Sequence, residues 1–198
     1  TTTRVGAFQV TSAAQTDLAN VNANSIAVTS TNTDLNGTAY TAAAGGDVTF
    51  TGAVDLTAGA TTTTVTAGGQ AGDVITFTST IDDDVAGQTG LTLIAGLGDV
   101  NLQGNVGATN AVAQLLATGA NITFGDTING VADGAQSLTL NSGTAGVVSV
   151  VGAIGDEHPL STLTLANSAG ATFAAAVTAN TRFGDVTHNR SSARKVSF

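Results

Sequence analysis

A repeat of 22 to 27 residues constrains this chain more than any other feature. In each copy two apolar residues flank a small polar residue, and another aliphatic residue follows four positions later. The copies are Val48-Thr49-Phe50 with Val54, Ile75-Thr76-Phe77 with Ile81, Val100-Asn101-Leu102 with Val106, Ile122-Thr123-Phe124 with Ile128, Val148-Ser149-Val150 with Ile154, and Ala171-Thr172-Phe173 with Val177. Repeats of this length are typical of solenoids, in which each unit buries its apolar face only against its neighbours.

A second strand pattern lies between these copies. Leu91-Thr92-Leu93, Leu138-Thr139-Leu140 and Leu163-Thr164-Leu165 are nearly identical, and residues 61–66 and 114–116 occupy the corresponding places in other repeats. Each repeat is therefore expected to contain a bent double strand, a loop of variable length and a third short strand.

The alternation within each copy predicts which side chains face inward. Successive side chains of a strand point to opposite faces, so Val48 and Phe50 are expected to point inward and Thr49 outward. Stacked copies would align Phe50, Phe77, Leu102, Phe124, Val150 and Phe173 in one interior column. The sequence therefore predicts an all-β fold, a right-handed parallel β-helix of about eight coils with three short strands per coil.

Two other folds fit parts of the composition. An antiparallel sandwich or barrel would need many hairpins, but the Asn-Gly hairpin signal occurs only at Asn36-Gly37 and Asn129-Gly130. The 25 Gly and 10% charged residues could accompany disorder, whereas 42% hydrophobic residues favour a packed core. The likeness of the copies at equivalent positions favours the β-helix over both.

The pattern divides the chain into three segments. Residues 1–45 carry looser strands and are expected to form degenerate N-terminal coils, residues 46–181 form the regular repeats, and residues 182–198 form a basic tail. Neither end shows a polar helical cap, which solenoids use to prevent end-to-end association. The expectation is that the segment belongs to a longer array or continues into a neighbour.

The formal net charge is −9, and its distribution is uneven. Residues 5–181 contain no Lys or Arg, while Arg182, Arg190, Arg194 and Lys195 lie in the tail. Without cations the body is not expected to bind nucleic acid or anionic lipid. No apolar run reaches the ~18–20 residues needed to cross a bilayer, so no direct membrane insertion is expected. A solvated tail is favoured over a contact with an acidic neighbour.

No catalytic, cofactor-binding or metal-binding residue is assigned from the sequence, and the protein is not expected to be an enzyme. Polysaccharide-active β-helix enzymes need carboxylates together with Lys or Arg, which the body lacks. A glycosidase could use two carboxylates alone, but no recurring exterior pair is evident. His158 lies in a turn-like insertion, Asp156-Glu157-His158-Pro159, where a solvated loop is favoured over a general base.

Asp82-Asp83-Asp84 is the densest negative stretch and is expected to lie in a loop. Calcium would need several oxygens around one ion, but contiguous Asp side chains do not all point one way, so no calcium site is assigned. Gly-Asp pairs at 46–47, 72–73, 98–99 and 184–185 are interpreted as corners, with Gly at positive φ and Asp bonding the backbone two residues on. The outward Thr residues are too irregular to favour ice binding.

Several segments resemble repeats of large secreted bacterial surface proteins. They are residues 47–54, 98–107 and 160–173. The resemblance is to autotransporter passengers, including S-layer-like surface antigens of rickettsial type, and to filamentous-haemagglutinin-like adhesins. It covers about residues 46–180 and implies export across a Gram-negative outer membrane and display on the cell surface. The membrane barrel and secretion domains of those proteins are not in this sequence.

The leading functional expectation is a structural and adhesive segment, a rigid stalk displayed outside the cell. The expected partners are flanking coils or other copies of the same protein, and a host or neighbouring-cell surface. A self-assembling subunit of a surface layer or extracellular filament is the alternative, and a polysaccharide-active enzyme is a distant one.

Overall fold

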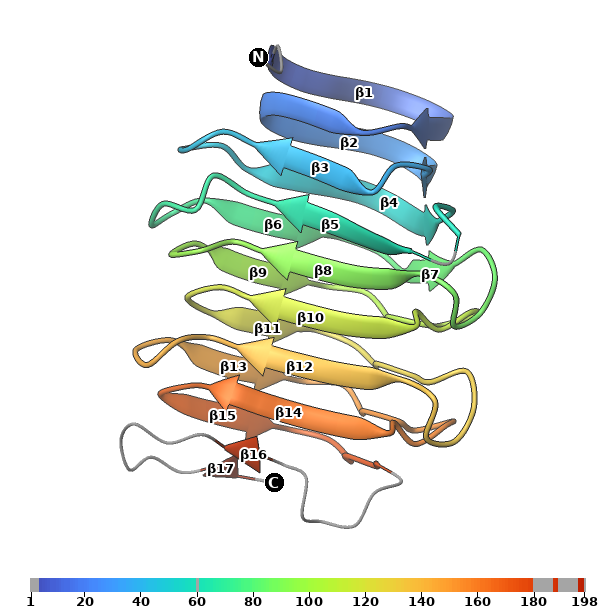
Figure 1. Cartoon of the computed structure of the whole chain (residues 1–198), viewed down its shortest axis with the longest axis vertical. Helices are drawn as coiled ribbons and strands as arrows, with labels where there is room; N and C mark the ends of the chain where they lie inside the picture. The colour runs from blue at the N-terminus through green and yellow to red at the C-terminus, as the bar shows by residue number, and fades with distance from the viewer. Residues whose placement is uncertain (1–3, 60, 180–186, 189–195, 198) are drawn as a thin grey trace.

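The chain forms a right-handed parallel β-solenoid, seen in a computed structural model that describes residues 4–59, 61–179, 187–188 and 196–197 (Figure 1). The predicted fold class is therefore confirmed. The solenoid has about seven turns, slightly fewer than the eight expected. The prediction divided the whole chain by the repeat length, whereas the coils whose side chains are described begin near Val5 and end near Ala179.

The described residues form seventeen strands, which make one continuous sheet that winds around the axis. They are β1 (Val5–Leu18), β2 (Val21–Leu35), β3 (Ala39–Ala42), β4 (Val48–Leu56), β5 (Thr62–Thr66), β6 (Val74–Phe77), β7 (Ile81–Asp83), β8 (Gly90–Ile94), β9 (Asp99–Leu102), β10 (Gln114–Thr118), β11 (Ile122–Phe124), β12 (Ser137–Asn141), β13 (Val147–Val150), β14 (Thr162–Asn167), β15 (Gly170–Phe173), β16 (Thr187–His188) and β17 (Val196–Ser197).

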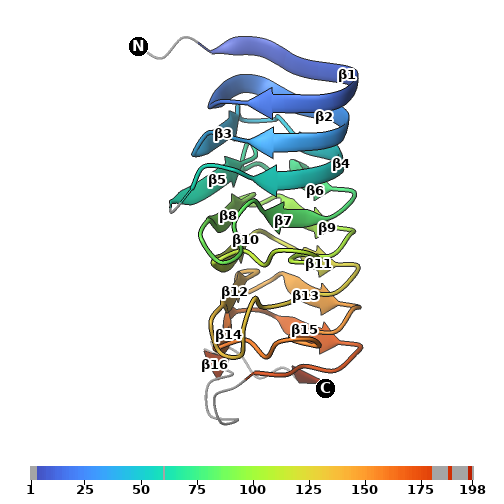
Figure 2. The same cartoon turned by 90° about the vertical axis from the view of Figure 1, so that its right-hand side faces the viewer.

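The coil has three faces, and each face is a parallel ladder. The first runs through β4, β6, β9, β11, β13 and β15. The second begins with the ends of β1, β2 and β4 and with β7, and continues as single bridges through Val106, Ile128, Ile154 and Val177 (Figure 2). The third runs through β3, β5, β8, β10, β12 and β14. This arrangement confirms the repeat of a bent double strand and a third short strand.

The predicted interior column is present. Phe50 pairs in register with Phe77, and the ladder continues through Leu102, Phe124 and Val150 to Phe173. All six side chains are buried, and the Phe50 and Phe77 rings stack with their centroids 5.0 Å apart. Each coil thus covers the apolar surface that the next coil would otherwise expose to water.

The N-terminal coils contain the longest strands of the molecule. β1 has 14 residues and β2 has 15, and they run in register over most of their length. Val10 pairs with Val28 and Val28 with Phe50, so the interior column extends upward to Val10. Val10 and Val28 are only 18 positions apart, because one strand bends through the corner where later coils insert a loop.

Tyr40 places a hydrogen-bonding hydroxyl inside this part of the core. Its hydroxyl donates to the Leu18 carbonyl oxygen at 2.7 Å and accepts from the Gly37 backbone N–H at 2.9 Å. Burial raises the pKa of Tyr40 to about 12. The phenol therefore joins the turn after β2 to the end of β1 in the coil above.

The Gly-Asp corners differ from the prediction in two ways. Asp47 accepts from the Val74 backbone N–H and Asp99 from the Asn121 backbone N–H, so these carboxylates join consecutive coils instead of closing local turns. Gly72 has the expected positive φ of 96°, but Gly98 does not. Gly98 is required for another reason, since a Cβ there would overlap the Asp73 carbonyl oxygen of the coil above.

Candidate functional site: an aspartate ladder on the N-terminal coils

Four aspartates stack on the second face of the solenoid. Asp17 pairs in register with Asp34, Asp34 with Asp55, and Asp55 with Asp82. Their neighbours Leu35 and Leu56 point into the core, so the Asp side chains point outward. We call Asp17, Asp34, Asp55 and Asp82 the aspartate ladder. Adjacent strands lie ~4.8 Å apart, which keeps four formal negative charges close together.

Amide side chains provide most of the ladder's polar contacts. The Asn32 Nδ2 group donates to Asp34 Oδ1 and to Asp55 Oδ2, both at 2.9 Å. The Gln15 Nε2 group donates to Asp17 Oδ1 at 3.5 Å. Among the residues with described side chains the only Lys or Arg is Arg4, and its Nε donates to Asn22. The ladder is therefore bridged by neutral donors and not by cations.

The pKa of Asp34 is raised above its ordinary value of 3.8. Partial burial is the main cause, and the carboxylates of Asp17 and Asp55 add to it because like charges disfavour ionisation. The hydrogen-bonding contribution of Gln15 acts in the opposite direction. The folded N-terminal coils thus hold the Asp34 proton more tightly than the unfolded chain does.

The sequence contains a recurring signal for the aspartate ladder, a polar or apolar pair followed by Asp-Leu, which the prediction did not use. Residues 15–18 read Gln-Thr-Asp-Leu, residues 32–35 read Asn-Thr-Asp-Leu, and residues 53–56 read Ala-Val-Asp-Leu. In each segment the Asp follows an inward-facing residue. The three segments lie in successive turns of the solenoid. The prediction that no exterior carboxylate pair recurs was therefore wrong, because the four Asp residues are separated by unequal intervals of 17, 21 and 27 residues and align only in the register of the folded strands.

The last aspartates of this region fix two loops. Asp82 Oδ1 accepts from the Thr109 and Asn110 backbone N–H groups at 2.8 and 3.1 Å. Asp83 pairs in register with the inward Leu56 and is buried, and its Oδ2 accepts from the Gln88 and Thr89 backbone N–H groups at 2.7 Å each. Residues 81–83 are thus a strand, not the loop that was expected.

These hydrogen bonds give Asp82 and Asp83 structural roles. One carboxylate lies on the outer side of β7 and the other on the inner side, so the two do not converge on one point. Among the described residues, no group of three or more His, Asp or Glu side chains is placed to hold a metal ion.

The two histidines lie apart from the ladder. His158 Nδ1 lies 3.1 Å from Asp133 Oδ1, and both side chains are exposed on loops of successive coils. A surface pair of this kind contributes little to stability. His188 lies in β16, for which only the backbone is described.

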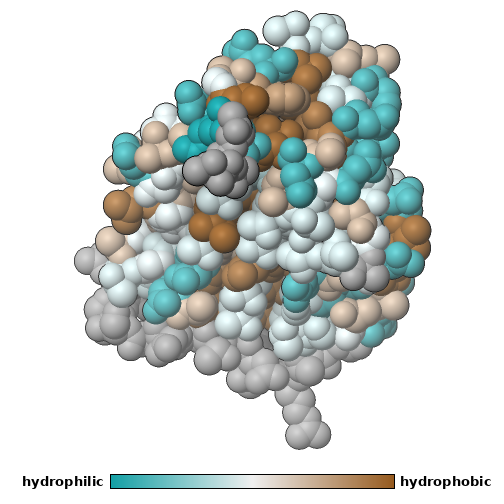
Figure 3. Space-filling model, turned by 45° about the horizontal axis from the view of Figure 1, so that its top comes forward, coloured by the Kyte–Doolittle hydropathy of each residue, from teal (hydrophilic) through white to brown (hydrophobic). Residues whose placement is uncertain are grey.

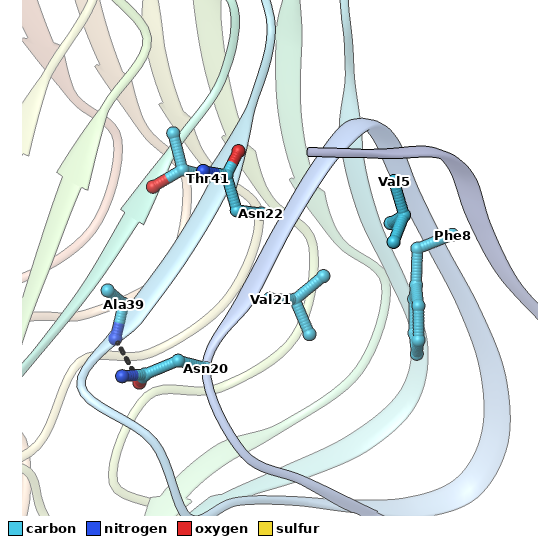
Figure 4. Close-up of a pocket in the computed structure, with 7 residues that line it drawn as sticks. All are labelled: Val5, Phe8, Asn20, Val21, Asn22, Ala39 and Thr41. Carbon is cyan, nitrogen blue, oxygen red and sulfur yellow. Dashed lines mark hydrogen bonds between the residues drawn. The ribbon is translucent and has the colours of Figure 1, made fainter. Parts of the chain in front are cut away.

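The N-terminal end of the solenoid carries a hollow of about 530 Å³. Val5, Phe8 and Val21 form its apolar side, and Asn20, Asn22, Ala39 and Thr41 form its remaining wall (Figure 4). The Asn20 Oδ1 atom accepts from the Thr38 and Ala39 backbone N–H groups at 2.7 and 3.0 Å. The hollow therefore has an apolar side, and on its remaining wall the Asn20 side chain already accepts hydrogen bonds from the backbone.

The fold and these surfaces define the class of molecule, a parallel β-solenoid with a polar exterior. No family model, curated protein or solved structure matches the chain. The described residues also form no helix of the length and apolarity that a bilayer crossing requires.

Proposed function

We propose that this chain is a rigid structural and adhesive segment of a large protein displayed on a bacterial cell surface. The observation that carries the proposal is the continuous interior column, which links every coil from Val10 to Phe173. Parallel backbone ladders on three faces join the same coils. A rod built in this way resists bending because bending would open core contacts and hydrogen bonds on one side.

The exterior of the rod supports the same proposal. Along the first face the outward column reads Thr49, Thr76, Asn101, Thr123, Ser149 and Thr172. These short polar side chains have little conformational entropy to lose when they contact another surface. The absence of Lys and Arg from residues 5–181 also removes the cleavage sites of trypsin-like proteases. Both properties suit a segment exposed outside a cell.

The proposal assigns no catalysis to the aspartate ladder. A glycosidase needs its two carboxylates on either side of a bound sugar, in a cleft that excludes bulk water. The ladder instead lies along the outside of stacked strands, and the hollow described above is lined by other residues. Asp17, Asp34 and Asp55 also accept hydrogen bonds from the Gln15 and Asn32 amides, which hold these carboxylates against the strand surface.

The cell-surface location rests on the resemblance of residues 46–180 to repeats of exported surface proteins. It is tested with an antibody raised against this chain, applied to intact and to permeabilised cells of the source organism. Labelling of intact cells is expected. Labelling that requires permeabilisation would contradict the proposed location while leaving the fold unaffected.

The stalk role is tested by pulling on the folded chain between its ends in a force spectrometer. We expect a high and stepwise resistance, since each coil must lose its ladder hydrogen bonds in turn. Extension at a force typical of an unstructured linker would contradict the role of a spacer.

A further inference from the structure

The two Asn-Gly dipeptides of the chain do not form the hairpins for which this dipeptide is a common signal. Asn36-Gly37 lies between β2 and β3, and Asn129-Gly130 begins the segment that leads from the second face to β12 (Figure 1). The strands β2, β3 and β12 all run parallel to those of neighbouring coils. Asn-Gly is also the dipeptide in which asparagine deamidates most readily, because glycine has no side chain to obstruct the reaction. The two identical dipeptides therefore offer the same reaction in two different surroundings.

Deamidation begins when the backbone nitrogen of the glycine attacks the side-chain carbonyl carbon Cγ of the preceding asparagine. The nitrogen loses its proton to hydroxide as the N–Cγ bond forms. The Cγ–Nδ2 bond then breaks, and ammonia leaves with a proton taken from water, so that a cyclic succinimide remains. Water opens this ring at either of its carbonyl carbons, which gives aspartate or an isoaspartyl linkage through the side chain. Water is the only co-reactant, and hydrophilic and neutral residues prevail on the face shown in Figure 3, so the outside of the coils is open to it.

At the first dipeptide the attacking nitrogen is engaged. The Gly37 N–H donates to the Leu18 carbonyl oxygen at 3.2 Å and to the Tyr40 hydroxyl at 2.9 Å, and Gly37 itself is buried. On the side chain to be attacked, Asn36 Oδ1 accepts from Thr57 Oγ1. The attack on Asn36 therefore requires both hydrogen bonds of Gly37 to break first.

At the second dipeptide the attacking nitrogen is not engaged. The Gly130 N–H has no hydrogen-bond acceptor among the described residues, whereas the next N–H, that of Val131, donates to Gln136 Oε1 at 2.8 Å. Gly130 is buried, and a buried N–H without an acceptor is rare. Its nitrogen gives up no hydrogen bond within the protein when it attacks. The Asn129 Oδ1 atom accepts from the Glu157 backbone N–H at 3.4 Å, and this donor would stabilise the negative charge that the oxygen acquires during the attack.

We propose that Asn129-Gly130 is a site of spontaneous covalent modification in the folded protein, at which Asn129 converts to aspartate or isoaspartate, and that the fold protects Asn36-Gly37 from the same reaction. The product carries a negative charge on a side chain that is 9% exposed in the unmodified protein. The isoaspartyl form also adds one backbone atom between the Ile128 bridge and β12. The modification therefore loosens this segment from the next coil. The inference concerns the chemistry of one corner and is independent of where the protein is displayed.

Peptide mapping by mass spectrometry provides the test, because deamidation changes the mass of the peptide that contains the asparagine. Chymotrypsin makes the peptides, since residues 5–181 contain no Lys or Arg for trypsin. The pure chain is incubated at mildly alkaline pH, once folded and once in concentrated guanidinium chloride. The denatured chain is expected to react at similar rates at both dipeptides, since neither keeps its folded contacts.

In the folded chain Asn129 is expected to deamidate at least about tenfold faster than Asn36. A tenfold change in rate corresponds to about 1.4 kcal/mol, which is within the net value of the two hydrogen bonds that Gly37 must lose. Equal rates in the folded chain, or a faster reaction at Asn36, would overturn the proposal. So would a folded chain in which neither asparagine reacts while both react in the denatured chain.

Two variants test the assigned cause, and circular dichroism checks that each is folded. Tyr40→Phe keeps the buried ring but removes the hydroxyl that accepts from the Gly37 N–H, so Asn36 is expected to react faster while the rate at Asn129 stays unchanged. Gly130→Ala places a side chain beside the attacking nitrogen and is expected to slow the reaction at Asn129 alone. An unchanged rate at Asn36 in the first variant, or at Asn129 in the second, would contradict the proposed control by the glycine nitrogen. If Tyr40→Phe does not fold, the comparison of the folded and denatured original chain still decides.

Discussion

At the scale of single residues, the alternation of inward and outward positions controls stability. The inward residues of the first face are buried almost completely, and their outward neighbours pair in register with the equivalent residues of adjacent coils. Thr123, for example, lies between Asn101 and Ser149, whereas Phe124 lies between Leu102 and Val150. Two consecutive residues of one strand therefore tolerate very different substitutions.

Phe124→Asp is expected to destabilise the protein by at least about 4 kcal/mol, because it removes a buried ring and leaves an unpaired charge in the interior column. Thr123→Asp is expected to cost about 1 kcal/mol or less, because its side chain remains in contact with water. Urea unfolding followed by circular dichroism measures both changes. Equal damage from the two substitutions would contradict the assignment of inner and outer faces.

The ladder makes a second residue-scale prediction, in which pH is the variable. A raised folded-state pKa means that Asp34 favours the folded state at pH values below 3.8, and that this contribution is lost as the pH rises through the folded-state pKa. Asp34→Asn removes the repulsion from Asp17 and Asp55. At pH 7 and low salt the variant is expected to be more stable by roughly 0.2–1 kcal/mol, a range that salt screening reduces.

The pH profile separates this explanation from a general effect of charge. The stability difference between Asp34→Asn and the original chain should shrink as the pH falls through the raised folded-state pKa of Asp34 and be smallest below 3.8, because the protonated Asp34 no longer repels its neighbours. Asp84→Asn changes the net charge equally at an exposed loop position and serves as the control. A difference that stays constant with pH, or that the control reproduces, would contradict the role of like-charge stacking.

At the scale of strands and corners, the close approach of backbones determines where glycine is needed. Gly98 adopts an ordinary backbone conformation, but a Cβ at that position would overlap the carbonyl oxygen of Asp73 in the coil above. Gly170 is the first residue of β15, in register with Val147, and a Cβ added there would have nothing within 4 Å. Both glycines lie where a chain corner leads into the first face, but only Gly98 lies too close to the coil above for a side chain.

Gly98→Ala is expected to cost about 1–3 kcal/mol, because the backbone of one coil must move away from the next. Gly170→Ala is expected to be neutral or to stabilise by about 0.4–1 kcal/mol through the lower entropy of the unfolded chain. Thermal unfolding measures both. Similar destabilisation by the two substitutions would show that the corner conformation, and not the spacing between coils, limits the side chain.

The strand arrangement was predictable from the sequence wherever a side chain repeats its role in every coil. The inward residues at 50, 77, 102, 124, 150 and 173 did so, and their alignment was predicted residue by residue. The corner contacts were not, because Asp47 and Asp99 bond to backbone groups that lie 27 and 22 residues away. Such partners depend on the length of each loop, which the repeat pattern does not determine.

The aspartate ladder was missed for a related reason. Its members are separated by 17, 21 and 27 residues, so they align only once the register of β1, β2, β4 and β7 is known. Asp83 also departs from the alternation, since a carboxylate occupies the position that Leu56 fills one coil earlier. It is accommodated there because two loop N–H groups satisfy it. The structural role of Asp83 thus interrupts the apolar pattern on which the prediction relied.

At the scale of the whole molecule, the fold is one-dimensional, since each coil contacts mainly the coils before and after it. Stability is then approximately a sum over coils and the interfaces between them. The strand pairs and the interior column are therefore repeated from coil to coil, whereas the aspartate ladder is confined to the coils of β1, β2, β4 and β7.

Distances measured along the first face test the stacking of coils most directly. The chain contains no Cys, so pairs of Cys can be introduced at outward positions and spin-labelled without competing sites. Thr49 serves as the fixed position, with Asn101, Thr123, Ser149 or Thr172 as the second. The account predicts backbone separations that increase by ~4.8 Å per coil, reaching about 24 Å for Thr49 and Thr172. Separations that fail to increase with coil number would contradict the parallel stack.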